Sequence, residues 1–424
     1  MVHQTMPPST SKAASASSKM THIAMSPGVR GRISRSLDAA WRSVGAAILG
    51  TLAGCSSVSL SVPGPLAPPP VGASTAPRPD SATPATPGLA VARGRARWIP
   101  ARFSELPGWD GDRSAELWPA LLRGCDRPAA GWAALCAEAR GAGIELLSDA
   151  ATRAWLAQRL QPYRVESSEG ASEGLITGYF EPLVEASRAP RPGFQVPLHA
   201  PPTDLATRRP YWTRQQLETV PAAQQGLRGR EIAYVADPLD ALILQIQGSG
   251  RLMLSEPDGS RRQVRVAFAG HNDLPYRSVG RWLIEQGEIR PEQASWPGIK
   301  AWARQNPRRV NELLWSNPRV VFFREEALPD PQLGPRGAQS VPLTPGRSIA
   351  VDPTSIPYGT PVWLDTSEPL SSTPLRRLVM AQDTGSAITG AVRADYFWGW
   401  GDAAEAQAGR MKQPLRMWVL VPRS

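Results

Sequence analysis

The sequence predicts a mixed α+β protein, mainly β with helices, whose C-terminal part forms a small closed β-barrel. Two stretches of different periodicity support this prediction. From about Arg97 to Leu160, apolar side chains recur three and four positions apart, which indicates helices. From Ser340 onward, short apolar runs are separated by Pro and Gly turns, which is typical of the short strands of a closed barrel.

The stretch between these parts is predicted to contain both strands and helices. Strand-like runs are EGLITGYFEPLVEAS (173–187), REIAYVADPLDALILQIQGSGRLML (230–254), QVRVAFAGHND (263–273) and NPRVVFFREE (317–326). Helical spacing occurs in PYRSVGRWLIEQGEI (275–289), WPGIKAWARQ (296–305) and NPRRVNELLW (306–315), and the four tryptophans of these segments are expected in the core. The run 230–254 would contain two strands, with Gln245, Gln247 and Ser249 alternating along the second. Alternation would place both glutamines on one face.

Residues 1–54 are predicted to be a signal peptide. Four arginines between residues 30 and 42 precede the apolar run VGAAILGTLAG (44–54), which is too short to span a membrane as a helix. The sequence LAGC ending at Cys55 resembles a lipobox, so we expect Cys55 to be lipidated; the alternative is a chance match in an Ala- and Gly-rich chain. Because Ser56 is not the Asp associated with inner-membrane retention, we expect a lipoprotein on the periplasmic face of the outer membrane.

The next segment is expected to be a tether. Residues 55–95 begin with the lipidated cysteine and are rich in Pro, Ser, Ala and Thr, a composition that cannot bury a core. The formal net charge of the chain is +10, of which residues 1–54 contribute +5. The remaining charge suits an anionic cell-envelope polymer, and no basic patch indicates nucleic-acid binding.

The two remaining cysteines are expected to form a disulfide. In an exported protein, the pair Cys125 and Cys136 favours a disulfide over a metal or redox site. Only His199 and His271 remain after the signal peptide, so we expect no His-rich metal site, and the sequence indicates no cofactor.

Three acids near the C-terminus point to chemistry on carbohydrate. Asp383, Asp395 and Asp402 lie among glycines, and four aromatic residues follow Asp395 within five positions. Apolar surroundings disfavour a charged carboxyl, so Asp395 is predicted to have a raised pKa, as a general acid requires near neutral pH. Asp383 either assists Asp395 or makes an Asx turn or helix cap. Asp402 occupies an N-cap position, which favours a structural role.

Several motifs together resemble the membrane-bound lytic murein transglycosylase A family. They occur in family order from about Glu105 to Pro422, and the last two resemble its three-aspartate, barwin-like module. The motifs are ITGYFEP (176–182), QIQGSG (245–250), AGHNDLPYRSVG (269–280), NPRVVFF (317–323), VDPTSIPYGTPVWL (351–364) and AQDTGSAITG with ADYFWGWGDAAEAQAG (381–409).

The resemblance implies two β-rich domains with a groove between them. A double-psi β-barrel catalytic domain with N-terminal helices would comprise residues 96–178 and 338–424. A β-barrel-like substrate-binding domain, residues 179–337, would be inserted into it. Family members cleave the β-1,4 bond between N-acetylmuramic acid and N-acetylglucosamine of peptidoglycan and leave a 1,6-anhydromuramoyl end.

The resemblance also implies roles for individual residues. Asp395, in RAD where some relatives have HFD, would be the single acid/base, with Asp383 and Asp402 supporting it. Expected substrate-binding residues are Tyr179, Gln245, Gln247, Ser249, Tyr276, Arg277 and Trp398. The glutamine amides would bind acetamido and hydroxyl groups, and Arg277 a lactyl or peptide carboxylate. Two alternatives remain: a hydrolytic glycosidase that uses Asp383 and Asp395 as a pair, and a peptidoglycan-binding lipoprotein without activity.

Overall fold

The computed structural model describes residues 89–143 and 148–423 of the chain. All of them belong to one compact unit, Ala82–Ser424. The predicted signal peptide, the lipidation site Cys55 and most of the predicted tether lie outside the described residues. The end of the predicted tether is a strand, β1 (Val91–Arg93), because its backbone pairs with β2 (Ala96–Pro100). In the described part of the chain, no helix is both long and apolar enough to cross a membrane.

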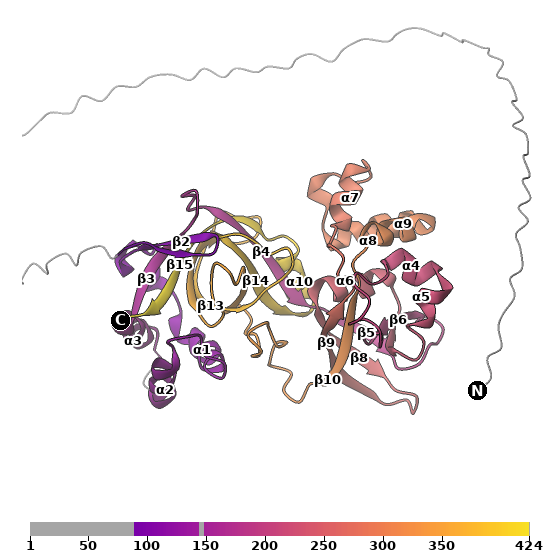
Figure 1. The fold of residues 1–424 in the computed structure, drawn as a ribbon, viewed down its shortest axis with the longest axis horizontal. Coiled ribbons are helices and arrows are strands. Elements are labelled where there is room, and N and C mark those ends of the chain that lie inside the picture. The colour runs from indigo at the N-terminus through magenta and orange to yellow at the C-terminus, as the bar shows by residue number, and fades with distance from the viewer. Residues whose placement is uncertain (1–88, 144–147, 424) are drawn as a thin grey trace, which may run out of the picture. The chain divides into compact units, whose positions relative to one another are not determined.

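A nine-stranded sheet forms the expected C-terminal barrel. Its other strands are β3 (Leu160–Ser167), β4 (Gly174–Glu181), β11 (Ser348–Val351), β12 (Pro361–Ser367), β13 (Pro374–Asp383), β14 (Arg393–Trp400) and β15 (Lys412–Pro422). The order is β1-β2-β3-β15-β12-β13-β11-β14-β4, and β15 also pairs with β4. The six strands from β15 to β4 therefore form a closed ring, with parallel pairs at β4–β14 and β11–β13 (Figure 1).

The barrel interior is apolar. The alternation of inward and outward side chains along β14 determines where Asp395 points. Ala394 and Tyr396 of β14 are both in the buried core of the barrel, together with Ile176 of β4 and Val351 of β11. Successive side chains of a strand point to opposite faces. Asp395, between two core residues, is therefore directed out of the barrel.

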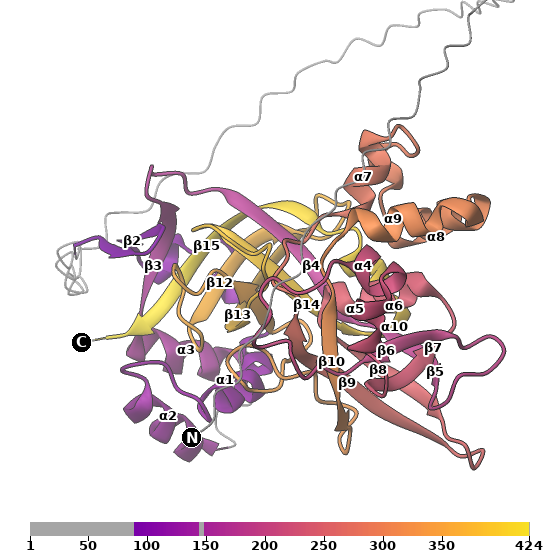
Figure 2. The same cartoon turned by 45° about the vertical axis from the view of Figure 1, so that its right-hand side comes forward.

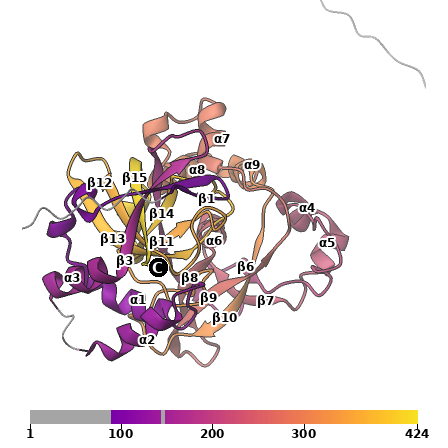
Figure 3. The ribbon, with the colours of Figure 1, turned by 60° about the vertical axis from the view of Figure 1, so that its left-hand side comes forward.

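Three helices pack together against the barrel, where Figure 3 shows them side by side. They are α1 (Trp118–Gly124), α2 (Ala133–Gly141) and α3 (Asp149–Arg159), and short 3-10 turns at Phe103–Glu105, Trp109–Gly111 and Ser114–Leu117 precede them. Trp118 and Trp155 meet edge to face, with ring centroids 5.1 Å apart. Cys125 and Cys136 form a disulfide, as the sequence predicted.

The second sheet has six strands, all from the middle of the chain. They are β5 (Leu183–Ser187), β6 (Val196–His199), β7 (Glu231–Val235), β8 (Ser249–Ser255), β9 (Arg261–His271) and β10 (Val321–Ala327), in the order β10-β9-β8-β5-β7-β6. Helix α6 (Pro238–Gln247) packs on this sheet: Ala241 and Leu244 share a core with residues of all six strands. The helices α4 (Arg214–Thr219) and α5 (Pro221–Gln225) lie between β6 and β7 in sequence.

Three further helices carry the tryptophans that the sequence placed in helical segments. They are α7 (Val279–Glu285), α8 (Trp296–Gln305) and α9 (Val310–Ser316), with 3-10 turns at Pro291–Gln293 and Pro307–Arg309, and they lie together in Figure 2. Trp302 is buried in their shared core, and Trp282, Trp296 and Trp315 are partly buried against it. The prediction that these residues are core is confirmed for Trp302, whereas the other three pack at the edge of the core.

The prediction of a strand over Gln245 and Gln247 was wrong. These residues form the last turn of α6, and only Ser249 begins a strand, β8. Asp237 caps the helix by accepting a hydrogen bond from the Leu239 amide, Pro238 occupies its first position, and Gly248 ends it with a φ of 78°. The run 239–244 is almost continuously buried, and a short, continuously apolar run does not distinguish a buried helix from a strand.

Candidate active site

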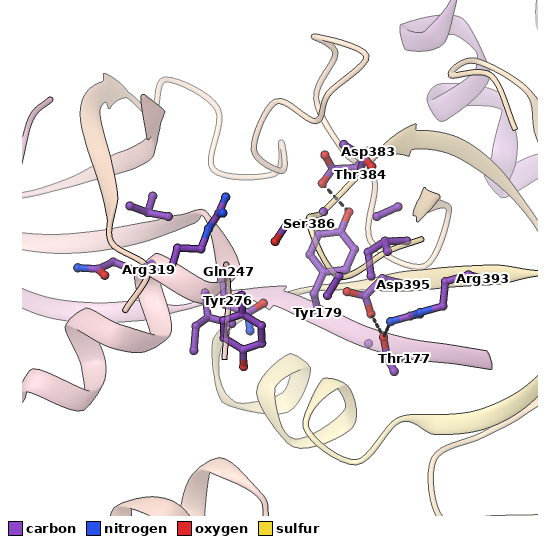
Figure 4. Close-up of a pocket in the computed structure, with 18 of the residues that line it drawn as sticks. Thr177, Tyr179, Gln247, Tyr276, Arg319, Asp383, Thr384, Ser386, Arg393 and Asp395 are labelled. Carbon is purple, nitrogen blue, oxygen red and sulfur yellow. Dashed lines mark hydrogen bonds between the residues drawn. The ribbon is translucent and has the colours of Figure 1, made fainter. Parts of the chain in front are cut away.

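A cavity of about 390 Å³ lies between the two sheets. One side is made by β4, β11, the ends of β13 and β14, and the loop Thr384–Ile388. The other side is made by the end of α6, Tyr276 and the segment leading into β10. Figure 4 shows Asp383, Tyr179, Asp395, Thr177 and Arg393 together on one side, and Gln247, Tyr276 and Arg319 on the other.

Ala350 places the two aspartates in one cavity wall. On β11 it is in register with Asp383 of the parallel neighbour β13 and with Asp395 of the antiparallel neighbour β14. Residues in register on neighbouring strands direct their side chains to the same face of a sheet. Both carboxyls and the small Ala350 side chain between them therefore line the cavity.

Asp395 is held by a short hydrogen-bonded chain. The Thr177 hydroxyl donates to Asp395 Oδ1 at 2.5 Å and accepts a hydrogen bond from Arg393 Nη2 at 2.9 Å. Burial is the largest influence on this carboxyl and raises its pKa to about 6, although Thr177 and the Arg393 charge lower it. Nearby Asp383 adds to the increase. The carboxyl is thus tuned toward the range in which it can give and take a proton near neutral pH.

Of the aromatic residues that follow Asp395, fewer are near the cavity than the sequence suggested. Tyr396 points into the barrel core, whereas Phe397 is in register with Tyr179 and packs on it with ring centroids 5.2 Å apart. Trp398 donates its indole N–H to the Met411 sulfur at 3.3 Å and is not part of the cavity wall. The predicted substrate contact of Trp398 is therefore absent from this cavity.

Asp383 lines the cavity and also forms two hydrogen bonds that fix neighbouring segments of the chain. Its Oδ2 accepts a hydrogen bond from the Tyr179 hydroxyl at 3.0 Å, and its Oδ1 accepts one from the Ala338 amide at 2.9 Å. Burial nevertheless raises its pKa. Burial is also the main reason why the pKa of Tyr179 is well above its usual value, and the Asp383 charge adds to it. Tyr179 is thus a neutral, fixed donor whose ring lines the cavity.

Both predicted glutamines line the cavity, although from a helix. Gln247 Oε1 accepts from the Phe180 amide at 3.1 Å, and Gln245 Oε1 accepts from Arg214 Nη2 at 2.7 Å. In the described part of the chain neither amide nitrogen donates a hydrogen bond, so both remain available to a ligand. Each glutamine is thus held by a hydrogen bond to its side-chain oxygen, and its side-chain N–H groups are available to a ligand in the cavity.

Other predicted site residues lie elsewhere. Tyr276 lines the cavity, but Ser249 is buried in β8 outside it. The Arg277 backbone amide binds Asn317 Oδ1 at 3.2 Å, and its side chain is not in the cavity wall. Asp402 is exposed in the first turn of α10 (Gly401–Ala408), whose N-cap is Trp400, so it is neither the expected N-cap nor a cavity residue.

Among the cavity residues that the sequence had not singled out are Thr177, Arg319 and Arg393. Each lies inside a quoted motif, but its type alone does not distinguish it from neighbouring polar residues. Burial lowers the pKa of both guanidinium groups, while Asp273 opposes the effect at Arg319 and Asp395 opposes it at Arg393. The cavity therefore has a cation on each side. Among the described residues, no three His, Cys, Asp or Glu side chains gather as a group that could hold a metal ion.

Two family models match the chain. The MltA specific insert domain matches residues 175–324, and the 3D domain matches residues 347–421. Membrane-bound lytic murein transglycosylase A of Vibrio cholerae is 32% identical over 252 residues, which are 58% of this chain and 65% of that protein. The Escherichia coli protein of the same name is 30% identical over 62% of this chain and 69% of its own length. The chain thus spans about two thirds of each of these relatives.

Two solved structures are similar to this chain over most of its length. A lytic transglycosylase of Burkholderia pseudomallei, LtgG, is 45% identical, and the match covers 80% of this chain and 98% of that one with a TM-score of 0.57. Escherichia coli MltA with bound chitohexaose is 25% identical over 80% of this chain and 95% of its own, with a TM-score of 0.60.

Proposed function

The chain belongs to the membrane-bound lytic murein transglycosylase A family, and from this we propose that it cleaves the β-1,4 bond between N-acetylmuramic acid and N-acetylglucosamine in peptidoglycan. The product would carry a 1,6-anhydromuramoyl end. The observation that carries the proposal is Asp395, a cavity carboxyl with a pKa of about 6 that is held by Thr177.

One carboxyl is sufficient for this reaction. Protonated Asp395 gives its proton to the glycosidic oxygen, and the bond from that oxygen to C1 of the muramoyl sugar breaks with its electron pair on the oxygen. The 6-hydroxyl of the same sugar attacks C1, and the Asp395 carboxylate takes the hydroxyl proton. Because the nucleophile is part of the substrate, the attack gains a high effective concentration, and no water is consumed.

The other cavity groups support substrate binding and charge stabilisation. Asp383, fixed by Tyr179 and Ala338, places negative charge in the wall that faces the developing oxocarbenium ion. The amide nitrogens of Gln245 and Gln247 are proposed to bind acetamido and hydroxyl groups. Arg319, rather than Arg277, is the cavity cation suited to a lactyl or peptide carboxylate. The chitohexaose bound to the Escherichia coli relative supports a glycan as ligand.

We further propose that the protein is a lipoprotein on the periplasmic face of the outer membrane. The signal at residues 1–54 and the LAGC sequence ending at Cys55 support this location. Glycan strands of peptidoglycan would be its partner, and the part of the segment 55–95 that precedes β1 would provide reach from the membrane. Two domains, 96–178 with 338–424 and 179–337, would enclose the glycan.

The test is product analysis by mass spectrometry. Purified peptidoglycan is incubated with the wild-type protein, with Asp395→Asn, and with the exposed control Asp110→Asn. Soluble muropeptides lighter by one water than hydrolytic fragments, present with the wild type and the control and absent with Asp395→Asn, are expected. No release by any of these proteins would instead favour the binding lipoprotein without activity.

A second candidate function follows from the shared cavity wall. Because Asp383 and Asp395 both line it, a hydrolytic glycosidase could use them as an acid and a base or nucleophile. Reducing ends in the product analysis, together with loss of activity in both Asp383→Asn and Asp395→Asn, would favour hydrolysis over transglycosylation.

A further inference from the structure

A second cavity, of about 410 Å³, lies on the other side of β10. Alternate residues of the segment that enters this strand face the two cavities: Arg319 and Val321 line the first, and Val320 and Phe322 line the second. Gln245 at the end of α6 lines both. The two cavities therefore share one wall, although different elements complete them.

The second cavity contains a buried cation without a counter-ion. Arg214 is 6% exposed; its Nε donates to the Asn317 carbonyl at 3.1 Å, and its Nη2 donates to the Arg319 carbonyl and to Gln245 Oε1, both at 2.7 Å. Within the described chain, no carboxylate pairs with it and Nη1 has no hydrogen-bond partner. Burial lowers the pKa of Arg214 to about 10, and Glu218 opposes the effect only through space.

An unpaired buried charge is costly, and hydrogen bonds to neutral carbonyls offset only part of that cost. A carboxylate entering the cavity would supply the missing charge, and guanidinium groups bind carboxylates well because their N–H groups match the two oxygens. The free Nη1 of Arg214 leaves a donor for such a contact.

The rest of the lining defines the ligand further. Leu217, Leu227 and Phe322 are buried apolar residues of the wall. The exposed residues of the lining include Glu218, Glu231 and Arg228. A ligand with a carboxylate at its inner end, apolar groups in the middle and an ammonium group at its outer end fits this order of side chains. A short peptide has this chemistry.

We propose that the second cavity binds a short peptide, with its carboxylate on Arg214 and its ammonium group near Glu218 and Glu231. In peptidoglycan the stem peptide meets this description, an identification that rests on the proposed function. Gln245 accepts a hydrogen bond from Arg214 and also lines the first cavity. A peptide carboxylate bound to Arg214 would therefore lie next to the glycan site.

Calorimetric titration of the purified protein with a synthetic stem tetrapeptide tests the proposal. Binding by the wild type is expected, with at least about tenfold weaker binding of the same peptide when its carboxyls are amidated, as for loss of a buried charge pair. Arg214→Gln is expected to weaken binding by a similar factor, and Glu231→Gln by a smaller one. Glu285→Gln, on exposed α7 outside the cavity, is the matched control and should bind as the wild type does.

The ligand comparison keeps the test valid even if Arg214→Gln fails to fold. Absence of peptide binding, or equal binding of the amidated peptide, would overturn the proposal. Asp395→Asn should bind the peptide as the wild type does, because Asp395 is outside the second cavity. If the wild-type protein binds the peptide but releases no anhydro-muropeptides, only the proposed reaction is rejected. A titration with the corresponding disaccharide tetrapeptide distinguishes the sources: tighter binding indicates the glycan-attached stem, and equal binding indicates free peptide.

Discussion

Glu181 accepts a hydrogen bond from Arg251 Nε at 2.7 Å, and both side chains are almost completely buried. Glu181 is the last residue of β4 in the barrel sheet, and Arg251 is on β8 of the second sheet. Arg265 of β9 contacts the same carboxylate, and the Arg251 guanidinium lies over the Trp400 ring at 3.8 Å. One buried acid therefore joins two buried cations where the chain passes between the sheets that enclose the cavity.

Glu181→Gln is expected to destabilise the protein strongly. It leaves two buried guanidinium groups without a counter-ion, so the free energy of unfolding should fall by about 3–5 kcal/mol in denaturant titrations. Glu185→Gln, which removes the exposed partner of Arg261, is the control and should cost less than about 1 kcal/mol. Equal effects of the two substitutions would contradict a special role for the buried cluster.

Asp395→Asn is expected to stabilise the protein at neutral pH. The pKa of Asp395 is about 6 in the folded protein and about 3.9 in an unfolded chain, so folding favours the protonated form. The stability from this group is complete below about pH 4 and is lost as the pH rises through 6. At pH 7 the free energy of unfolding of the variant should exceed that of the wild type by about 3 kcal/mol, because two pKa units correspond to roughly this amount, and at pH 3.5 the difference should vanish. Thermal unfolding across this pH range measures it.

Thr177→Val is expected to raise the pKa of Asp395 further, because the Thr177 hydroxyl stabilises the carboxylate. The pH optimum of muropeptide release should move upward by up to about one unit. Thr177→Ser keeps the hydroxyl and should keep the wild-type profile. A lower rate with an unchanged pH profile in Thr177→Val would mean that the threonine acts only through packing.

Tyr179→Phe is expected to lower the rate of release by about tenfold while the fold is retained, since the hydrogen bond to Asp383 is lost but the ring remains. Removing this donor should also raise the pKa of Asp383. Tyr163→Phe, in β3 outside the cavity, provides the comparison. Steady-state kinetics on soluble glycan strands would show the loss in kcat; a change confined to KM would instead assign Tyr179 to substrate binding.

Some individual residues and their properties could be predicted from the sequence. The increase in the pKa of Asp395 followed from apolar residues near a carboxyl, and the disulfide followed from two cysteines in an exported chain. The helix that ends at Gln245 and Gln247 was missed because the run 239–244 is apolar and buried except for Asp240, so one polar residue alone marks its outer face. Arg277 was expected to bind a carboxylate and Arg319 was not singled out, because the sequence does not show which guanidinium faces a cavity.

By itself, the sequence determined most of the element types, although not helix α6, together with the C-terminal barrel, the family and the acid that carries the proposed chemistry. These depend on local pattern, composition and the order of motifs along the chain. Only the tertiary structure decided that Ala350 brings Asp383 and Asp395 into one wall, that Thr177 holds Asp395, and that Arg214 is buried with no carboxylate of the described chain paired to it. The first two depend on strand register, and the burial of Arg214 depends on the packing of α4 against the segment that enters β10. Contacts between residues far apart in the sequence determine both.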